Sequence, residues 1–324
     1  MKKIVKFIGV LVLAFLSFAL ISCGHDKDFG QGDVVKKGIK INGKVLSNTS
    51  EVCVTPKKVT ITGATPDFID EHTADKDKGV LVEGRTVTLS PFVMGKYEVT
   101  QELYEAVMSG MEGIINPAPS SCYNDPYDDD IQELRPVEQV SWNQAAVFCN
   151  RLSEKEGYTK AYDIEIAEDG FISVTFIPGT NGYRLPTEAE WEFAARGGNP
   201  LKADWNYAYS GSNNCNDVGW TDANSSDITH QTGKKKPNRL GIYDMTGNVF
   251  EWCQDYAVEF DDLTGNDTNP WGSENGTYKV ERGGSYRYGN VATVTFRFWH
   301  DGSFSCYPYT EDSLIGFRVV RSIK

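Results

Sequence analysis

The chain has 324 residues, with 45 acidic against 32 basic side chains and a formal net charge of −13 at pH 7. Nucleic acids and anionic lipid surfaces repel so acidic a chain, and we therefore expect no nucleic-acid partner. The length is enough to bury one large hydrophobic core, and we find no internal repeat. The acidity is typical of a solubility charge on an exported protein.

The N-terminus has the order of a bacterial export signal. Three lysines in the first six residues precede an apolar run that continues to Ile21, and a small residue then stands before Cys23. The four positions before Gly24 resemble a bacterial lipobox, which implies cleavage before Cys23 and lipidation of that residue. The alternative is an uncleaved membrane anchor, since the apolar run is nearly long enough to span a bilayer.

Composition divides the chain into three parts. We assign residues 1–22 to a lipoprotein signal peptide, 23–56 to the lipidated cysteine and a tether, and 57–324 to one folded domain. The tether is polar and charged, with at most one weak strand. Acyl chains on Cys23 would make the membrane a partner, and we expect the protein on the bacterial cell envelope, at the outer-membrane surface.

Three helices are predicted from their capping residues. Thr100 is a suitable N-cap for a helix over 101–108. Residues 141–144 have the form of a capping box and begin a helix that Gly157 ends. Residues 187–190 form a second capping box directly after a Leu-Pro pair, which predicts a short third helix.

The cysteines after Cys23 are widely separated and show neither metal spacing nor a disulfide framework. An oxidising compartment would permit disulfides, but the connectivity stays open. Cys149 falls on the apolar face of the helix that begins after Ser141, and we predict that it is a buried thiol.

Several sequence blocks together resemble the formylglycine-generating, sulfatase-modifying family. They are residues 182–198 (GYRLPTEAEWEFAARGG), 238–252 (NRLGIYDMTGNVFEW), 282–285 (RGGS) and 316–321 (GFRVVR), in the family's order. The resemblance implies an α+β domain of the C-type lectin type with much irregular structure for its size. That fold carries both oxidases and plain binding proteins, so fold alone does not decide the function.

A compact, oxygen-rich stretch at residues 244–251 suits calcium, because it offers two carboxylates and turn carbonyls within a few residues. Family members bind calcium here. The resemblance implies a structural calcium ion held by the Asp244 side chain, the Gly247 and Val249 carbonyls and the Glu251 side chain. The alternative is a tight turn with a surface glutamate.

Redox catalysis in the family depends on a pair of cysteines that bind copper shortly before the closing Gly-Phe-Arg. The corresponding residues 294–299 contain no cysteine, and Cys306 stands alone. We therefore expect no copper, and we favour a protein without catalytic residues. An oxidoreductase of the formylglycine-generating type with altered metal ligands, and an accessory envelope lipoprotein, stay open as alternatives.

The C-terminal segment is aromatic, irregular and interleaved with small polar residues. That mixture is typical of binding surfaces, because Tyr and Trp give large contact areas at low entropic cost. Phe296 and Phe298 alternate, which predicts one face of a strand packed into the core. The remaining positions are predicted to bind a protein or small-molecule ligand: Arg287, Tyr288, Asn290, Trp299, His300, Asp301, Phe304, Tyr307 and Tyr309.

A narrower resemblance concerns the same segment. Variable proteins of diversity-generating retroelements use this fold and end in Arg-Gly-Gly-Ser, a hypervariable segment and Gly-Phe-Arg, as residues 282–285 and 316–318 do. With the lipobox, the chain is similar to the surface-displayed variable lipoproteins of oral treponemes. The resemblance implies diversified positions that bind ligands without catalysis.

Overall fold

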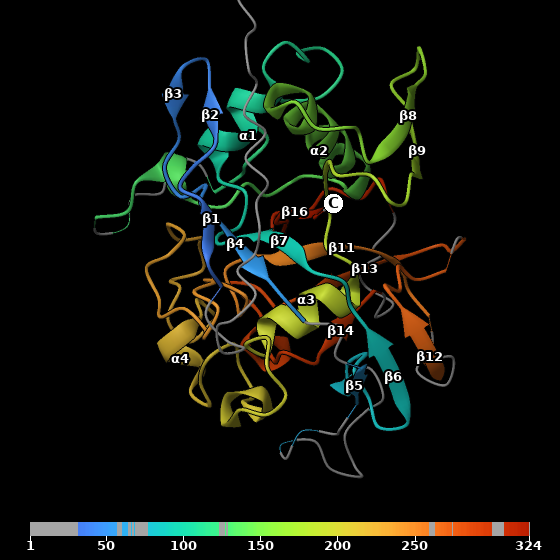
Figure 1. The fold of residues 1–324 in the computed structure, drawn as a ribbon. Coiled ribbons are helices and arrows are strands. Elements are labelled where there is room, and N and C mark those ends of the chain that lie inside the picture. The colour runs from blue at the N-terminus through green and yellow to red at the C-terminus, as the bar shows by residue number, and fades with distance from the viewer. Residues whose placement is uncertain are drawn as a thin grey trace, which may run out of the picture.

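The described chain consists of short strands and a few helices joined by long loops (Figure 1), which confirms the predicted α+β class. The computed structural model describes residues 32–56, 60–63, 66, 68, 77–122, 127, 129–258, 263–273, 275–299 and 308–323. Over these residues no helix is both long and apolar enough to cross a bilayer. Cys23 and the predicted signal peptide lie outside the described residues.

A five-stranded antiparallel sheet joins both ends of the described chain. Its order is β1 (Val34–Lys36), β4 (Glu51–Val54), β7 (Phe92–Gly95), β16 (Val320–Ser322) and β10 (Tyr183–Arg184). Since β4 and β16 flank β7, the first and last parts of the domain close the same sheet.

This sheet separates two hydrophobic cores. Successive side chains of a strand point to opposite faces, so Val319 and Val320 enter different cores. The Val319 core is packed by α1 and α2, whereas the Val320 core is packed by α3, which Figure 1 shows on the other side of the central strands.

A second sheet brings the later sequence blocks together. Its order is β14 (Arg297–Phe298), β13 (Lys279–Arg282), β11 (Phe250–Tyr256) and β15 (Ile315–Gly316), with β11 and β15 parallel. The smaller pairings are β12 (Gly265–Thr268), β6 (Arg85–Thr88) and β5 (Thr60–Thr62), the hairpin β2 (Lys40–Ile41) and β3 (Lys44–Val45), and the hairpin β8 (Tyr162–Ile166) and β9 (Ile172–Phe176).

The three predicted helices are present with the predicted caps. Thr100 caps α1 (Gln101–Met108), and full capping boxes begin α2 (Trp142–Glu156) and α3 (Glu188–Ala195). Helix α2 ends at Gly157, whose φ of 78° lies in the left-handed region that favours glycine. Short helical turns also occur: η2 (Gln132–Leu134), η3 (Ala203–Asn206), α4 (Cys215–Val218) and η5 (Gly289–Val291).

Residues 34–54 belong to the folded domain, so the prediction that the tether continues to residue 56 is wrong over this part. All four residues of β4 are buried and pair with β7. Ile39, Ile41 and Leu46 enter the α1–α2 core. Composition did not indicate these strands, because the apolar residues are few and stand among lysines and glycines. Their burial depends on strands that are distant in the sequence.

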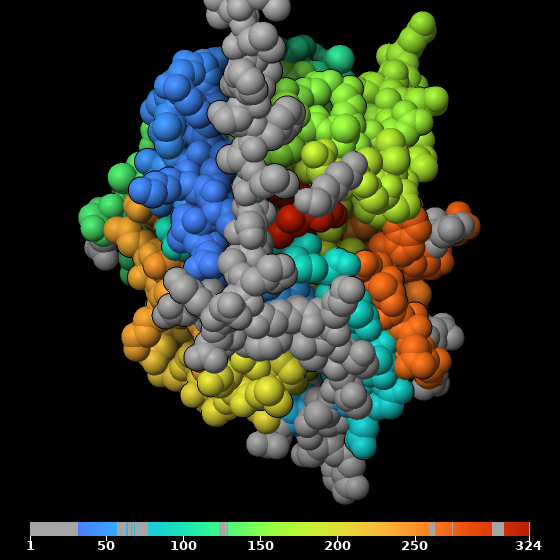
Figure 2. Space-filling model, viewed as in Figure 1, coloured from blue at the N-terminus to red at the C-terminus, as the bar shows by residue number. Residues whose placement is uncertain are grey.

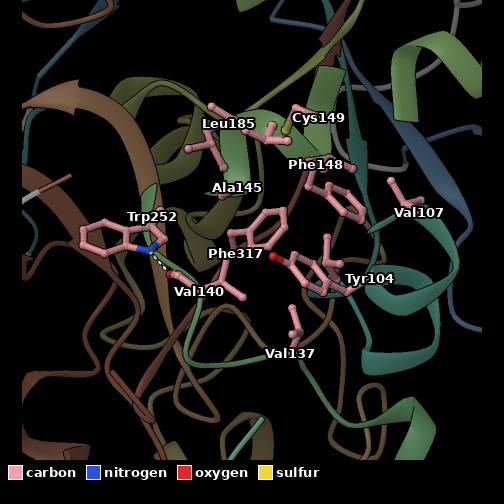
Figure 3. Close-up of a cluster of buried hydrophobic side chains, with 14 of the residues drawn as sticks. Tyr104, Val107, Val137, Val140, Ala145, Phe148, Cys149, Leu185, Trp252 and Phe317 are labelled. Atoms are coloured by element: carbon pink, nitrogen blue, oxygen red, sulfur yellow. Dashed lines mark hydrogen bonds between the residues drawn. The ribbon is translucent and has the colours of Figure 1, made fainter. Parts of the chain in front are cut away.

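Aromatic rings fill the α1–α2 core, as Figure 3 shows. The Tyr104 and Phe148 rings stack at 5.5 Å, and Phe317 meets Phe148 edge to face at 5.2 Å. The Trp252 indole N–H donates to the Val140 carbonyl at 2.8 Å. Cys149 lies in this core as a fully buried free thiol, as predicted, and burial raises its pKa.

A buried ionic network ties α3 to the second sheet. Arg282 donates to Glu188 at 2.7 Å and to Glu192 at 3.0 Å. Arg297 donates to both oxygens of Glu188, and Arg196 donates to Glu192. None of these five side chains is more than 3% exposed. Such a network is stable only while every charge keeps its partner.

Replacing Arg282 by alanine should therefore lower the free energy of unfolding by about 3–5 kcal/mol, because Glu188 and Glu192 would each lose a buried counter-charge. Urea unfolding followed by tryptophan fluorescence measures the change. The matched control is Arg287→Ala, which removes an exposed ion pair with Asp227 and should cost less than about 1 kcal/mol. Equal losses in the two variants would contradict the role given to the network.

Candidate functional site

The C-terminal segment has both buried and exposed residues after the Gly283-Gly284 turn. Arg287, Tyr288 and Asn290 are exposed, and so is Tyr309 further along the chain. Trp299 is only partly exposed, and its ring lies 5.0 Å from the guanidinium of Arg297. The other predicted ligand-binding residues lie outside the described chain: His300, Asp301, Phe304 and Tyr307.

An aromatic group lies beneath Tyr288. The Phe250 ring lies 6.4 Å from Tyr288 and 5.5 Å from Phe298, which in turn lies 6.5 Å from Phe296. Phe296 is buried, as predicted, whereas Phe298 packs against the core yet keeps part of its surface exposed. Phe250 is not among the residues predicted from the sequence to bind a ligand. Its place directly before Glu251, in the block 238–252, was a signal that could have indicated it.

The loop around residues 222–227 supports the exposed segment. Asp227 accepts two hydrogen bonds from the Arg287 guanidinium, at 2.6 and 2.9 Å. Asp222 accepts from the Gly289 amide at 2.9 Å, and the Ser225 hydroxyl donates to the Tyr286 carbonyl at 2.7 Å. These bonds fix the backbone on either side of Tyr288, so its ring stands on a supported turn.

The structure brings together Asp244 and Glu251, the two side chains predicted to bind calcium. A third carboxylate, that of Glu98, lies within electrostatic reach of both and was not predicted. All three are buried. Arg318 donates to both oxygens of Glu251 at 2.6 Å, and the Trp191 indole donates to the same carboxylate at 2.7 Å. Arg318 therefore pairs directly with Glu251, and its charge also acts through space on Glu98 and Asp244.

Burial shapes the charge of this cluster. Burial raises the pKa of Asp244 to about 6, although a hydrogen bond from the Gly233 amide opposes the shift. Burial also raises the pKa of Glu98 well above its usual range, helped by the charges of Asp244 and Glu251. Glu98 accepts from the Asn248 side chain at 2.7 Å and the Val249 amide at 3.2 Å.

A calcium ion at this place would use Asp244, the Gly247 and Val249 carbonyls and Glu251. Asp244 has one buried oxygen, Oδ1, without a hydrogen-bond partner. An ionised carboxylate has about four acceptor positions, and Glu251 uses three for Arg318 and Trp191. Gly247 has a φ of 72°, and a Cβ there would lie 2.1 Å from the Trp220 carbonyl, so only glycine suits this turn. In the described chain no group of three His, Cys, Asp or Glu side chains is arranged as a metal site.

Four cysteines of the described chain are free thiols, namely Cys122, Cys149, Cys215 and Cys253, whereas Cys53 is disulfide-bonded. The Cys122 thiol donates to the hydroxyl of Tyr286, the residue directly before the C-terminal segment, at 3.7 Å. Residues 294–299 themselves supply a buried guanidinium, that of Arg297, and no thiol.

Comparison with known proteins supports the resemblance seen in the sequence blocks. The chaperone protein LppX of Paenibacillus barcinonensis is 35% identical over 295 residues, which cover 78% of this chain and 91% of that protein. The formylglycine-generating enzyme of Thermomonospora curvata is 28% identical over 225 residues, covering 62% of this chain and 73% of the enzyme.

Solved structures give the same result. Variable protein 1 of Treponema denticola superposes with a TM-score of 0.64 at 30% identity, covering 84% of this chain and 98% of that protein. The family model for the sulfatase-modifying factor enzyme 1-like domain matches residues 44–323. The chain therefore belongs to the sulfatase-modifying factor enzyme 1-like family, with the C-type lectin-like, formylglycine-generating-enzyme fold that its sequence blocks predicted.

Proposed function

We propose that the protein is a non-enzymatic binding protein that contacts its ligand through the C-terminal segment 287–313. The observation that carries this proposal is the exposed Tyr288 ring on a braced turn, with Phe250 and Phe298 beneath it. Rigid aromatic side chains of this kind provide much of the energy of protein interfaces.

The relatives favour a polypeptide ligand. One similar structure is named a variable protein and one relative a chaperone. Under this proposal, residues 287–313 vary among related copies of the gene while the rest of the domain stays constant. Comparing the sequences of those copies tests this expectation. A family-type copper centre is disfavoured, because residues 294–299 contain no cysteine where the family's thiolates would be needed.

Tyr288→Ala tests the binding surface. Peptides selected from a random library on the wild-type protein should bind this variant at least tenfold more weakly, since a central aromatic contributes about 2 kcal/mol or more. The control is Phe171→Ala, an aromatic that is 59% exposed on the β8–β9 turn and should leave binding unchanged. If peptide affinity survives in Tyr288→Ala while its melting temperature is that of wild type, the surface is wrongly placed.

Formylglycine generation is the alternative that identity to the Thermomonospora curvata enzyme keeps open. Copper uptake together with oxygen consumption on a cysteine-containing sulfatase peptide would establish it and overturn the non-enzymatic proposal.

We also propose a structural calcium ion at Asp244, Gly247, Val249 and Glu251, for which the buried Oδ1 of Asp244 is the main support. Calcium at about one hundred times its dissociation constant should stabilise the protein by about 2.7 kcal/mol. Calorimetry in calcium and in EGTA measures this as a difference in melting temperature. Asp244→Asn should abolish the difference in melting temperature, whereas the exposed control Asp217→Asn should show the same difference as wild type. A wild-type melting temperature that is unchanged in EGTA contradicts the site.

Lipidation of Cys23 is the proposed link to the outer-membrane surface. Cells fed a labelled fatty acid should incorporate label into the wild-type protein, and Cys23→Ser should lose it, because no other residue occupies the lipobox position. Label retained by Cys23→Ser would contradict the lipid anchor. Protection of the intact protein from protease added to whole cells would contradict the location on the outer surface.

A further inference from the structure

A cleft of about 500 Å³ lies at the opposite end of β11 from Phe250. Figure 2 shows the yellow-green β8–β9 hairpin directly above the orange segment that contains β12, and the cleft is lined from both regions. Four aromatic side chains form its walls: Trp142, Phe176, Tyr256 and Trp271. The volume is that of an ordinary small-molecule site.

Lys279 lines this cleft and is only 2% exposed. Its Nζ lies 3.8 Å from the centre of the Trp142 ring and 3.5 Å from that of Tyr256. The Gln254 carbonyl accepts one of its hydrogen bonds, at 2.9 Å, and among the described residues no carboxylate forms an ion pair with it. A buried lysine without a direct ion pair is rare, because its desolvation is only partly compensated.

The charge of Asp255 acts on Lys279, but the two side chains form no direct ion pair. Asp255 accepts from the Glu188 amide at 2.8 Å. Burial lowers the pKa of Lys279 to about 7, and burial together with the charge of Glu188 raises that of Asp255 to about 7. An anion that entered the cleft would supply the direct ion pair that Lys279 lacks among the described residues.

A second buried donor faces the same cleft. The Tyr162 hydroxyl accepts from the Leu185 amide at 2.9 Å, so it must give its own proton to Gln254 Oε1, 2.8 Å away. That bond fixes which end of the Gln254 amide is oxygen. The amide nitrogen then donates to no other group of the described chain, and Gln254 is among the residues that line the cleft.

From this arrangement we infer that the cleft binds a sugar ring that carries a carboxylate, of the hexuronic acid type. The aromatic walls pack against the apolar C–H face of such a ring. Lys279 binds the carboxylate, and the Gln254 amide binds a ring hydroxyl. Further hydroxyls meet polar residues that line the mouth, namely Thr175, Ser273 and Asn275.

Two other ligand classes suit the cleft less well. A neutral sugar would leave Lys279 without a direct ion pair. An aromatic acid would use the walls and the lysine, but it would leave the Gln254 amide without a partner, which costs affinity. This site is independent of the C-terminal segment, and neither proposal requires the other.

Titration calorimetry of the intact protein with sodium glucuronate, glucose and benzoate tests the inference. Glucuronate should bind at least about tenfold more tightly than either of the others. Lys279→Met, which keeps the length of the side chain, should remove the preference for glucuronate over glucose. The control is Lys235→Met, since Lys235 also lies 3.8 Å over a tryptophan ring, that of Trp220, but outside the cleft.

Trp271→Ala gives a second variant, because Trp271 is partly exposed and its loss threatens folding less than a change at the buried Lys279. It should weaken glucuronate at least about tenfold with an unchanged melting temperature. Equal affinity for glucose and glucuronate would overturn the role of Lys279, and tighter binding of benzoate would overturn the sugar assignment. Absence of measurable binding of glucuronate to wild type would overturn the site.

Discussion

The buried ionic network around Glu188 and Arg282 is the constraint on which the domain depends. It connects the first sequence block, through α3, to the Arg-Gly-Gly-Ser turn and to the strand that contains Arg297. A buried charge that loses its partner is strongly destabilising, so the network favours one relative position of these segments. An otherwise irregular chain, with few long ladders, acquires a rigid frame in this way.

A parallel arrangement holds the second block. Glu251 receives the indole of Trp191 from α3 and the guanidinium of Arg318 from the closing block. The Gly-Phe-Arg sequence is therefore explained by packing: Phe317 fills the aromatic core while Arg318 points to the other side and neutralises a buried carboxylate. These residues identify the fold without implying any reaction, which is why the blocks alone could not separate an oxidase from a binding protein.

Local signals in the sequence were sufficient for the helices. Thr100, Ser141 and Thr187 act through bonds to residues three positions away, and each was predictable from its neighbours. Long-range contacts were not predictable in this way. β4 is defined by its pairing with β7, so composition alone assigned its residues to the tether. Glu98 and Asp244 are more than a hundred residues apart in the sequence, so nothing near Glu98 indicated that it would lie beside Asp244.

The same limit explains the cleft at Lys279. Nothing near Lys279 in the sequence marks it, because the rings that surround it come from α2, β9 and the loop after β12. Its strand partner, Tyr256, ends the strand that Phe250 begins. Six residues of extended chain span about 20 Å, so the proposed C-terminal surface and the proposed cleft site are far enough apart for a ligand in one to leave the other accessible.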